Sequence, residues 1–456
     1  MIVSEKVKIE RKQVTPSASR QIELDERIFY KWSISPTKQY KIHCGECSVH
    51  VTFIPSDLEQ SICIGESLCK ELQLPPLNHA LHLYFHENLG IFTFGIFIGL
   101  LTEVKETENG VSFGSVHEFC EELATYCAKN ETLFYVFSLK SYQETHLLGY
   151  VWNGERFELN NVPWPHVVHN RIHSRKRELS KGYQQFTAYL KEKHIPFFND
   201  HFLNKWESHQ HLVQQEHLLP YLPQTELLLN YSTLDTFLQQ HKSVYIKPIH
   251  GSQGRKIFRI EDNEGEYILD YTTFTGDIEK SYESTYELFK AIRPRLKGAF
   301  IVQQGISLLR YENRVLDFRF LCHMNSLSEW KVTSSVARIS SPKEFVSNIA
   351  RGGEIRKVPT ILRELLEPKQ AMTVGKMLHE LALEIASSIG QSEEGLFGEF
   401  GIDLALDENG KPWIIEINTK PSKNMDASSS SSTIRPSARS VIQYCLYLAN
   451  PFRGVN

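Results

Sequence analysis

Two short apolar runs near the C-terminus have the pattern that is typical of β-strands. They cover residues 400–406 and 413–418, and the segment between them contains Asn409-Gly410. This dipeptide favours the two-residue loop of a tight β-hairpin. With that loop, the pairing register places Asp403 directly opposite Glu416.

These two carboxylates make the hairpin a candidate metal site. Side chains alternate between the two faces of a strand, so Asn418 lies on the same face as Glu416. Two like charges directly opposite one another destabilise a sheet, and a cation between Asp403 and Glu416 would remove that penalty. Carboxylate and amide oxygens suit Mg²⁺. The alternative is a plain hairpin whose acidic side chains point into solvent.

The same kind of pattern divides the whole chain into three expected domains. Residues 1–80 contain short β-like runs separated by polar turns, and Pro75-Pro76 marks a break after them. Residues 81–194 alternate strand and helix patterns, which favours a parallel α/β unit. Residues 195–456 form the third domain. The expected elements include a buried strand at 91–101, a helix at 117–129, a strand at 132–137, a hairpin turning at Asn153-Gly154, a strand at 167–171, and a helix at 232–240 capped by Ser232 or Thr233.

Composition adds mainly exclusions. The 456 residues are 41% hydrophobic and 23% charged, as in an ordinary globular protein. A net charge of −4 argues against a general nucleic-acid binder. The N-terminus lacks the apolar core of a signal peptide, and the most apolar stretch, residues 89–101, is too short to span a bilayer. We therefore expect a soluble cytoplasmic protein with no membrane or nucleic-acid partner.

Two local motifs receive a plain interpretation. Cys44 and Cys47 form a CxxC, but no second CxxC follows to complete a zinc site, so we expect ordinary thiols in a turn. The eight cysteines are dispersed, which suits a reducing compartment. The stretch 171–181 is basic, and a solvated face is its expected environment.

A glycine-containing loop between two predicted strands, 244–247 and 256–260, is a second candidate site. Gly251 and Gly254 allow the loop to present backbone N–H groups to an anion. Lys247 ends the first strand, where its ammonium can meet a phosphate. The pattern is neither a P-loop nor a dinucleotide-binding fingerprint, and a simple hairpin is the alternative.

Charged residues on two later strands form a third candidate site. Residues 315–322 alternate strictly, so Asp317 and Arg319 share one face. Arg338 ends the following strand. Two arginines at strand ends can clamp phosphoryl oxygens or a substrate carboxylate. Paired surface charges on a half-buried sheet are the alternative.

Taken together, these motifs resemble the ATP-grasp fold over about residues 195–445. The matching features follow in the expected order: a lysine before a glycine loop, a strand ending in Gln303-Gln304, Asp317-Phe-Arg319, a strand-end arginine, Asn348 before Gly352-Gly353, and Asp403 followed by Glu416-Ile-Asn418. Phrases such as Val168-His-Asn-Arg-Ile172 and Pro196-Phe-Phe-Asn199 resemble the YheC/YheD-like ATP-grasp proteins, which are described as endospore coat-associated in bacilli. The resemblance implies a multidomain α+β and α/β chain. Two α+β subdomains would clasp ATP, after a small β-rich domain (1–80) and an α/β pre-ATP-grasp domain (81–194).

The resemblance also implies roles for individual positions. Lys205, Lys247, Gly251, Ser252, Gln253, Gly254 and Lys256 would surround the phosphates; Gln303, Gln304 and Ile306 would border adenine; Arg319, Arg338 and Asn348 would be catalytic; and Asp403, Glu416 and Asn418 would bind metal. The implied cofactors are ATP and one or two Mg²⁺ ions, with Mn²⁺ as an alternative.

The chemistry that the resemblance implies is an ATP-dependent carboxylate–amine ligation through an acyl-phosphate. Its partners would be small-molecule or peptide carboxylates and amines. A structural spore-coat protein without catalysis, or with ATP binding alone, is the main alternative, and a kinase-like transferase is a third. The complete set of charged residues favours the enzyme.

Overall fold

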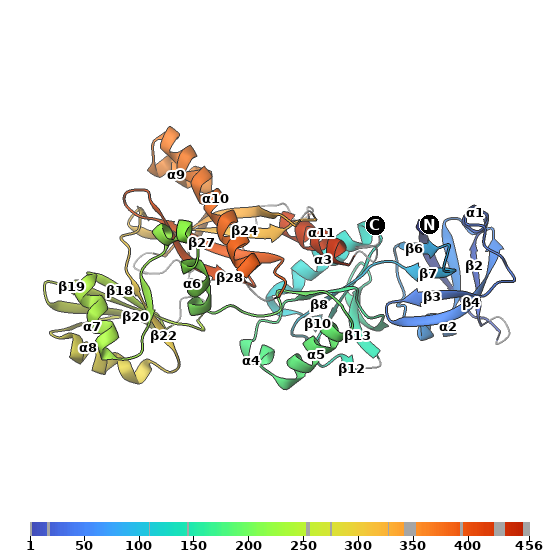
Figure 1. Ribbon diagram of the computed structural model, residues 1–456, viewed down its shortest axis with the longest axis horizontal. Coiled ribbons are helices and arrows are strands. Elements are labelled where there is room, and N and C mark those ends of the chain that lie inside the picture. Colours follow the sequence, from blue (N-terminus) through green and yellow to red (C-terminus); the bar gives the residue numbers. More distant parts are fainter. Residues whose placement is uncertain are drawn as a thin grey trace.

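The computed structural model describes residues 2–15, 19–108, 110–143, 146–251, 256–273, 276–326, 328–341, 353–392, 395–423 and 434–449. The chain forms three regions that follow one another along its longest axis (Figure 1). A β-barrel lies at one end, a mixed sheet with helices lies in the middle, and two further sheets lie at the other end.

The N-terminal region is a closed barrel with the strand order β1-β5-β2-β4-β3-β7-β6. Strand β1 pairs in parallel with β5, and β2 pairs in parallel with β4. Its elements are β1 (Ile2–Lys12), β2 (Gln21–Asp25), α1 (Glu26–Lys31), β3 (Tyr40–Cys44), β4 (Cys47–Ser56), β5 (Ser61–Gly65), α2 (Glu66–Glu71), β6 (Leu81–His86) and β7 (Ile91–Phe94).

The barrel continues past residue 80, where the sequence predicts a domain boundary. Phe85 of β6 and Phe92 of β7 stack at 4.3 Å between ring centroids and pack inside the barrel with Phe53. The expected single strand at 91–101 is therefore wrong: Gly95 and Ile96 separate β7, which belongs to the barrel, from β8 (Phe97–Leu101) of the next sheet. Both strands are apolar, so the pattern alone does not reveal the change of sheet.

The middle region contains a sheet with the order β12-β13-β11-β8-β15-β16, in which β8, β11 and β15 run parallel. The predicted helix, strand and hairpin are confirmed as α3, β11 and the β13–β14 pair. The remaining bounds are β9 (Lys105–Thr107), β10 (Gly110–Ser112), α3 (His117–Lys129), β11 (Leu133–Phe137), β12 (Tyr142–Gln143), β13 (His146–Trp152), β14 (Phe157–Val162), β15 (Val167–Asn170), α4 (Arg175–Glu178), α5 (Lys181–Glu192) and β16 (Phe197–Phe198).

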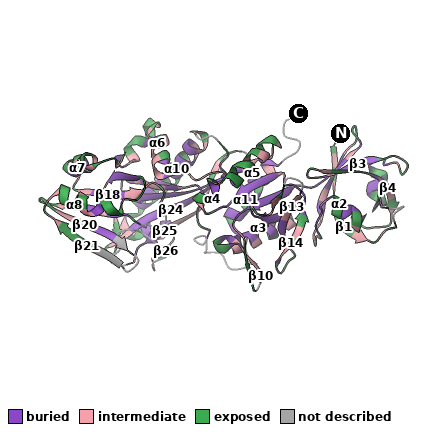
Figure 2. Ribbon diagram, turned by 90° about the horizontal axis from the view of Figure 1, so that it is seen from below, coloured by how far each residue is buried: buried purple, intermediate pink, exposed green. Residues whose placement is uncertain are grey.

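The C-terminal helix α11 (Pro436–Leu448) packs on this middle region. It lies beside α3 in both ribbon views (Figures 1 and 2). Val441, Ile442 and Cys445 of α11 join Phe119 and Leu123 of α3 in one apolar core. The chain thus returns to its middle region after completing the last two sheets.

The third region begins with a sheet of the order β17-β22-β18-β19-β20-β21, covered by two helices. The first helix starts after Asn230, whose side chain accepts a hydrogen bond from the Thr233 amide at 3.1 Å. The predicted cap at Ser232 or Thr233 is therefore wrong, because the side-chain oxygen of Asn230, two residues before Ser232, accepts the capping hydrogen bond instead. The bounds are β17 (Thr225–Leu227), α7 (Tyr231–Gln240), β18 (Ser243–Pro248), β19 (Phe258–Asn263), β20 (Glu266–Thr273), β21 (Gly276–Tyr282), α8 (Thr285–Ile292) and β22 (Phe300–Gln304).

The last sheet has the order β26-β25-β24-β27-β28, with β23 beside β24. Helix α10 packs on its apolar face through residues such as Leu378 and Ile385. The bounds are α6 (Lys205–Val213), β23 (Arg310–Tyr311), β24 (Arg314–Met324), β25 (Trp330–Ile339), β26 (Glu354–Arg356), α9 (Val358–Leu365), α10 (Pro368–Ser392), β27 (Glu399–Leu406) and β28 (Pro412–Asn418).

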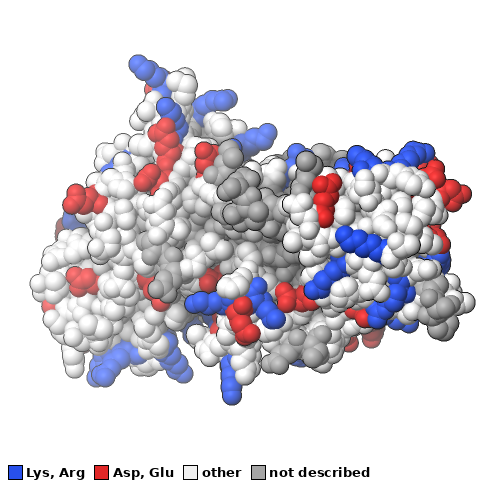
Figure 3. All heavy atoms as spheres, turned by 45° about the vertical axis from the view of Figure 1, so that its right-hand side comes forward, with Lys and Arg blue, Asp and Glu red and all other residues white. Residues whose placement is uncertain are grey.

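The surface is mixed in charge. On the face drawn in Figure 3, the lysines and arginines are interspersed with aspartates and glutamates and form no large patch of one sign. No helix within the described ranges has the length and apolar character needed to cross a bilayer. All eight cysteines are free thiols. Cys44 and Cys47 lie opposite one another in the register of β3 and β4, on either side of the turn, as expected.

Candidate nucleotide-binding site

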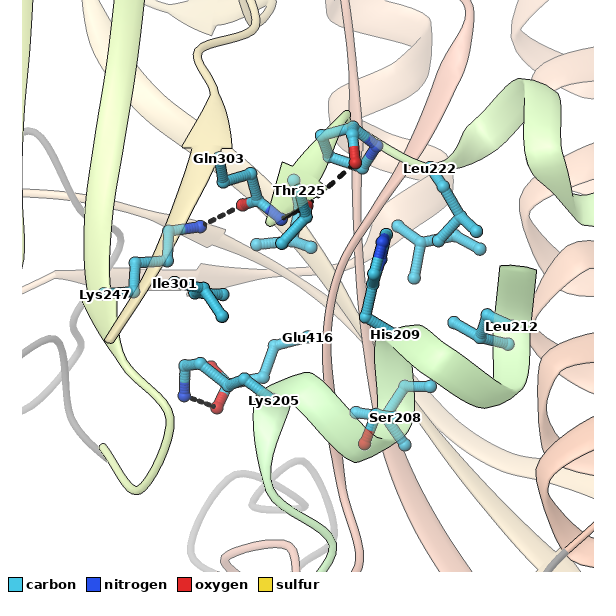
Figure 4. A pocket seen from close by; sticks show the side chains of 14 residues that line it. Lys205, Ser208, His209, Leu212, Leu222, Thr225, Lys247, Ile301, Gln303 and Glu416 are labelled. Atoms are coloured by element: carbon cyan, nitrogen blue, oxygen red, sulfur yellow. Dashed lines mark hydrogen bonds and ion pairs between the residues drawn. The ribbon is translucent and has the colours of Figure 1, made fainter. Parts of the chain in front are cut away.

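A pocket between the two sheets of the third region brings several of the predicted residues together (Figure 4). We call it the inter-sheet pocket. Its open space, together with adjoining solvent, is about 480 Å³. It is lined by Lys205, Ser208, His209, Leu212, Leu222, Pro223, Thr225, Lys247, Ile301, Gln303, Ile414, Ile415, Glu416 and Ile417.

Lys205 enters the pocket because of how α6 begins. Asn204 caps the helix, and its side chain accepts hydrogen bonds from the amides of Trp206 and Glu207 at 2.9 and 3.0 Å. The Glu207 carboxylate in turn accepts from the Asn204 amide at 2.9 Å, which completes a capping box. Lys205 is thereby fixed as the first helical residue.

The Lys205 ammonium connects the two sheets. Its Nζ donates to Glu416 Oε1 of β28 at 2.7 Å and to the Gly251 carbonyl after β18 at 3.0 Å. The ion pair is partly exposed, with 15% of the Lys205 side chain and 29% of the Glu416 side chain accessible. An anionic ligand in the pocket can therefore reach this cation.

Lys247 faces the same pocket from the end of β18. Its Nζ donates to Gln303 Oε1 at 2.6 Å, and Gln303 Nε2 donates to Thr225 Oγ1 at 2.9 Å. Burial is the main cause that lowers the pKa of Lys247 to about 8; the charge of Lys205 acts in the same direction, and Glu416 opposes the shift. Among the described residues Lys247 forms no ion pair; its ammonium donates to the Gln303 amide oxygen and lies 5.3 Å from the centroid of the Tyr245 ring.

The β27–β28 hairpin does place Asp403 opposite Glu416, but not through the predicted two-residue loop. The Asp407 amide donates to the Lys411 carbonyl, and Leu406 pairs with Pro412. The loop is thus longer than predicted and shifts the register by one residue. A bulge at Ile415, between the pairs Leu404–Ile414 and Asp403–Glu416, shifts it back. The predicted pair exists because two irregularities cancel.

The charge of Asp403 is compensated by arginines. Arg319 lies directly opposite Asp403 on β24; its Nε also donates to Oδ1, and its Nη2 donates to Oδ2 at 2.7 Å. Arg338 Nη2 lies 3.0 Å from the same Asp403 oxygen and also donates to Asp317 Oδ2 at 2.7 Å, while Arg338 Nε donates to Asp317 Oδ1 at 2.5 Å. Burial alone would raise the pKa of Asp403, but Arg319 and Arg338 hold it below the ordinary value.

The predicted metal set stays a prediction. Asp403 and Glu416 are brought together, and Asn418, two residues beyond Glu416, pairs with Gly401 on the same two strands. The described ranges contain no group of three or more histidine, cysteine, aspartate or glutamate side chains that could hold a metal ion. The predicted set has two carboxylates and one amide, which matches the oxygen chemistry of Mg²⁺.

The remaining predicted residues are scattered or lie outside the described ranges. Gln304 accepts a hydrogen bond from the Gln224 amide at 3.3 Å, and neither it nor Ile306 lines the pocket. Lys256 is exposed just before β19, with a φ of 58°. Ser252, Gln253, Gly254, Asn348 and Gly352 fall outside the described residues.

The sequence did not predict a buried charged cluster that lies where the middle region meets β27. We call it the Glu399 cluster. Glu399 is fully buried, and its carboxylate binds Arg171 and Lys423, with His169 and His323 at 3.4 and 3.3 Å. Burial would raise the pKa of Glu399, but Lys423 and Arg171 keep it well below the ordinary value.

Arg171 is an exception to the expected solvated face at 171–181, where Lys176, Arg177 and Lys181 are exposed as expected. Its side chain is fully buried and also donates to the Pro421 carbonyl at 2.9 Å. The nearby Lys420, also buried, pairs with Glu178. One signal was available: Glu399 begins an apolar strand and lies four residues before Asp403, on the same face.

Comparisons with known proteins agree with this arrangement. The family model described as YheC/D-like ATP-grasp matches residues 194–448. The chain is 29% identical over 383 residues to the endospore coat-associated protein YheD of Bacillus subtilis (strain 168), covering 81% of each chain. It is 21% identical over 282 residues to YheC of the same organism, covering 61% of this chain and 75% of YheC.

Among solved structures, the chain is similar to the ATP-grasp ligase PsnB in complex with a minimal precursor, with 12% identity, a TM-score of 0.43, and coverage of 76% of this chain and 98% of PsnB. It is also similar to the D-alanine-D-alanine ligase from Coxiella burnetii, with 12% identity, a TM-score of 0.43, and coverage of 78% and 96%. The family match spans more than half of the residues and includes both sheets of the inter-sheet pocket. This chain belongs to the YheC/D-like ATP-grasp family.

Proposed function

We propose that this protein is an ATP- and Mg²⁺-dependent carboxylate–amine ligase that works through an acyl-phosphate. The observation that carries the proposal is the convergence of Lys205, Lys247 and Glu416 on one pocket between two sheets. Asp403, Arg319 and Arg338 lie directly behind Glu416. Phosphoryl transfer depends mainly on positioning and on charge stabilisation, and this set offers both.

In this proposal the two lysines hold the phosphates. Lys247 has no carboxylate partner among the described residues, so a phosphate would give its ammonium the negative counter-charge that the Gln303 amide does not supply. Lys205 binds Glu416 at 2.7 Å, and a phosphate can replace that carboxylate when Glu416 turns to a metal ion. Gln303 suits this role because its amide orients Lys247 without neutralising it.

Asp403, Glu416 and Asn418 would hold Mg²⁺. The two acids face each other across the hairpin, and the arginines keep Asp403 ionised. When bound, Mg²⁺ neutralises phosphate charge and orients the transferred group. The metal would then provide the positive charge near Glu416 that Lys205 now supplies.

The reaction requires no nucleophilic side chain. A substrate carboxylate oxygen bonds to the γ-phosphorus of ATP, the bond from that phosphorus to the bridging oxygen breaks, and ADP leaves. An amine nitrogen then attacks the acyl carbon, inorganic phosphate leaves, and the nitrogen loses a proton. Arg319 and Arg338 are held rigid by Asp403 and Asp317, so their positive charge is in place before the transition state forms.

A second candidate function is an ATP-binding structural protein of the spore coat. It is favoured by the names of YheD and YheC, both endospore coat-associated. The two functions differ in turnover: the ligase releases ADP only when a suitable carboxylate and amine are present, whereas the structural protein binds ATP without releasing ADP.

The proposal is tested first by nucleotide binding. MgATP should raise the melting temperature of the parent, and Glu416→Gln should remove most of that increase. Glu408→Gln is the matched control, because Glu408 makes the same charge change in the exposed turn of the same hairpin. We prefer Glu416 to Asp403 because a change at Asp403 would remove the counter-charge of the buried Arg319.

Turnover is tested by ADP release, screened across amino acids and short peptides. In the ligase, Glu416→Gln should reduce the rate by about 10²–10³-fold. If Glu416→Gln keeps the full MgATP-induced increase in melting temperature, the nucleotide site is misassigned.

A further inference from the structure

The basic stretch after β15 brings Arg175 to Phe202, just ahead of Lys205, although Arg175 itself is not among the residues that line the inter-sheet pocket. Helix α4 lies on the side of the middle region that faces the last two sheets (Figures 1 and 2). The guanidinium carbon of Arg175 lies 5.0 Å from the ring centroid of Phe202, which precedes α6 and Lys205. Arg175 therefore crosses from the middle region to the segment that delivers Lys205.

Arg175 differs from the other arginines around the site because its guanidinium has no acceptor among the described residues. Arg319 and Arg338 each make bidentate ion pairs with an aspartate. The Arg175 side chain makes no hydrogen bond or ion pair with any residue that the structure describes, and its Nε is buried without an acceptor. Lys420, on the same Phe202 ring at 4.4 Å, is instead satisfied by Glu178.

The charges around Arg175 show which site it faces. Burial lowers the pKa of Arg175, and Glu416 is the strongest of the negative charges that oppose this shift, ahead of Glu178 and Glu207. Burial lowers the pKa of His250, next to Gly251, and the charge of Arg175 acts in the same direction. Arg175 thus lies within electrostatic reach of the Lys205–Glu416 pair without binding to it.

An unpaired, partly desolvated guanidinium is costly, and an anionic ligand would recover that free energy. Arginine stays charged at every physiological pH and binds carboxylate or phosphoryl oxygens through two parallel hydrogen bonds. Phe202 restricts the guanidinium from one side, which leaves its donor edge available to a ligand.

We propose that Arg175 is a ligand-binding residue that the middle region contributes to the inter-sheet pocket, where it binds an anionic oxygen of the substrate carboxylate or of the γ-phosphate. This inference rests on the proposed function, because it takes the pocket to be the nucleotide site. It assigns to the middle region a direct contact with the reacting groups. It also predicts that a carboxylate substrate approaches from the α4 side.

The test compares the parent, Arg175→Gln and Arg175→Lys as full-length proteins. Calorimetric titration measures the affinity for MgADP, for a non-hydrolysable MgATP analogue, and for glutarate added to the MgADP complex. Lys176→Gln is the matched control, because Lys176 is the exposed neighbour on the same helix. Arg175→Lys keeps the charge but loses the two-pronged geometry, so it should retain part of the affinity.

If Arg175 contacts the γ-phosphate, Arg175→Gln should lower the affinity for the ATP analogue about tenfold or more and leave the affinity for MgADP unchanged. A contact to the substrate carboxylate predicts that both nucleotides bind as in the parent while glutarate binding falls by a similar factor. The inference is overturned if Arg175→Gln matches Lys176→Gln and the parent with all three probes.

Lys247→Ala separates this failure from failure of the proposed function. If Lys247→Ala lowers the affinity for both nucleotides and Arg175→Gln leaves the affinity for all three probes unchanged, only the role proposed for Arg175 is wrong. If Lys247→Ala leaves nucleotide affinity unchanged, the pocket itself is misassigned.

Discussion

Strand β27 carries two carboxylates on one face, and their surroundings are opposite in kind. Glu399 is sealed: it is fully buried, and its oxygens are shared between Arg171, Lys423 and two histidines. Four residues later, Asp403 adjoins Glu416, which keeps 29% of its side chain exposed and has one lysine partner at the pocket. Both clusters contain charges of both signs, but only the second has room for a further ion.

The comparison separates charge that holds the fold from charge that is available to a ligand. A buried ion pair adds little stability over an apolar pair, yet removing one partner is strongly destabilising. The Glu399 cluster joins β15 of the middle region to β27, so it fixes how these two regions meet. At the pocket, Lys247 and Arg175 lack carboxylate partners among the described residues, and the excess positive charge there suits a polyanion such as ATP.

The largest effect is expected at the sealed cluster. Glu399→Gln removes the buried carboxylate that Arg171 and Lys423 share, which should reduce the free energy of unfolding by about 3–5 kcal/mol. Urea unfolding measures the loss, and Glu408→Gln is the control. A change of less than about 1 kcal/mol, within the ordinary range of surface substitutions, would show that the cluster is not what joins the regions.

A smaller effect is expected at Lys247. Lys247→Ala removes one charge-assisted contact to phosphate, worth about 1.5–3 kcal/mol, so nucleotide affinity should fall by about ten- to a hundredfold. The stability of the free protein should change little, in contrast to Glu399→Gln. Lys242→Ala, an exposed lysine just before the same strand, is the control for calorimetric titration. Equal affinities in the two variants would remove Lys247 from the site.

The smallest effect is the pH dependence of that affinity. The pKa of Lys247 is about 8, so its ammonium is mostly charged at pH 7 and mostly neutral at pH 9. A phosphate binds the charged form, and affinity should therefore fall about tenfold as pH rises from 7 to 9. Lys247→Ala should abolish most of this dependence. A flat profile in the parent would show that Lys247 stays charged or does not contact the nucleotide.

The local elements were predictable because their signals are local. The helix at 117–129 and the strands of the last hairpin follow from apolar periodicity alone. The register of the β27–β28 hairpin was less predictable. Asp403 lies opposite Glu416 only because the bulge at Ile415 offsets a loop that is longer than predicted. Periodicity does not report such compensations, since a bulge adds one residue without changing the apolar pattern around it.

Thus the sequence by itself determined most of the strands and helices, the family resemblance, and the charged and amide residues Lys205, Lys247, Gln303 and Glu416 that line the inter-sheet pocket. Only the tertiary structure decided how the charges are distributed among partners. Arg171 and Glu399 are 228 residues apart, and Lys205 and Glu416 are 211 apart. No local pattern encodes a contact over such a separation. The same residue types become a sealed cluster or an open site according to which distant cations the fold brings to them.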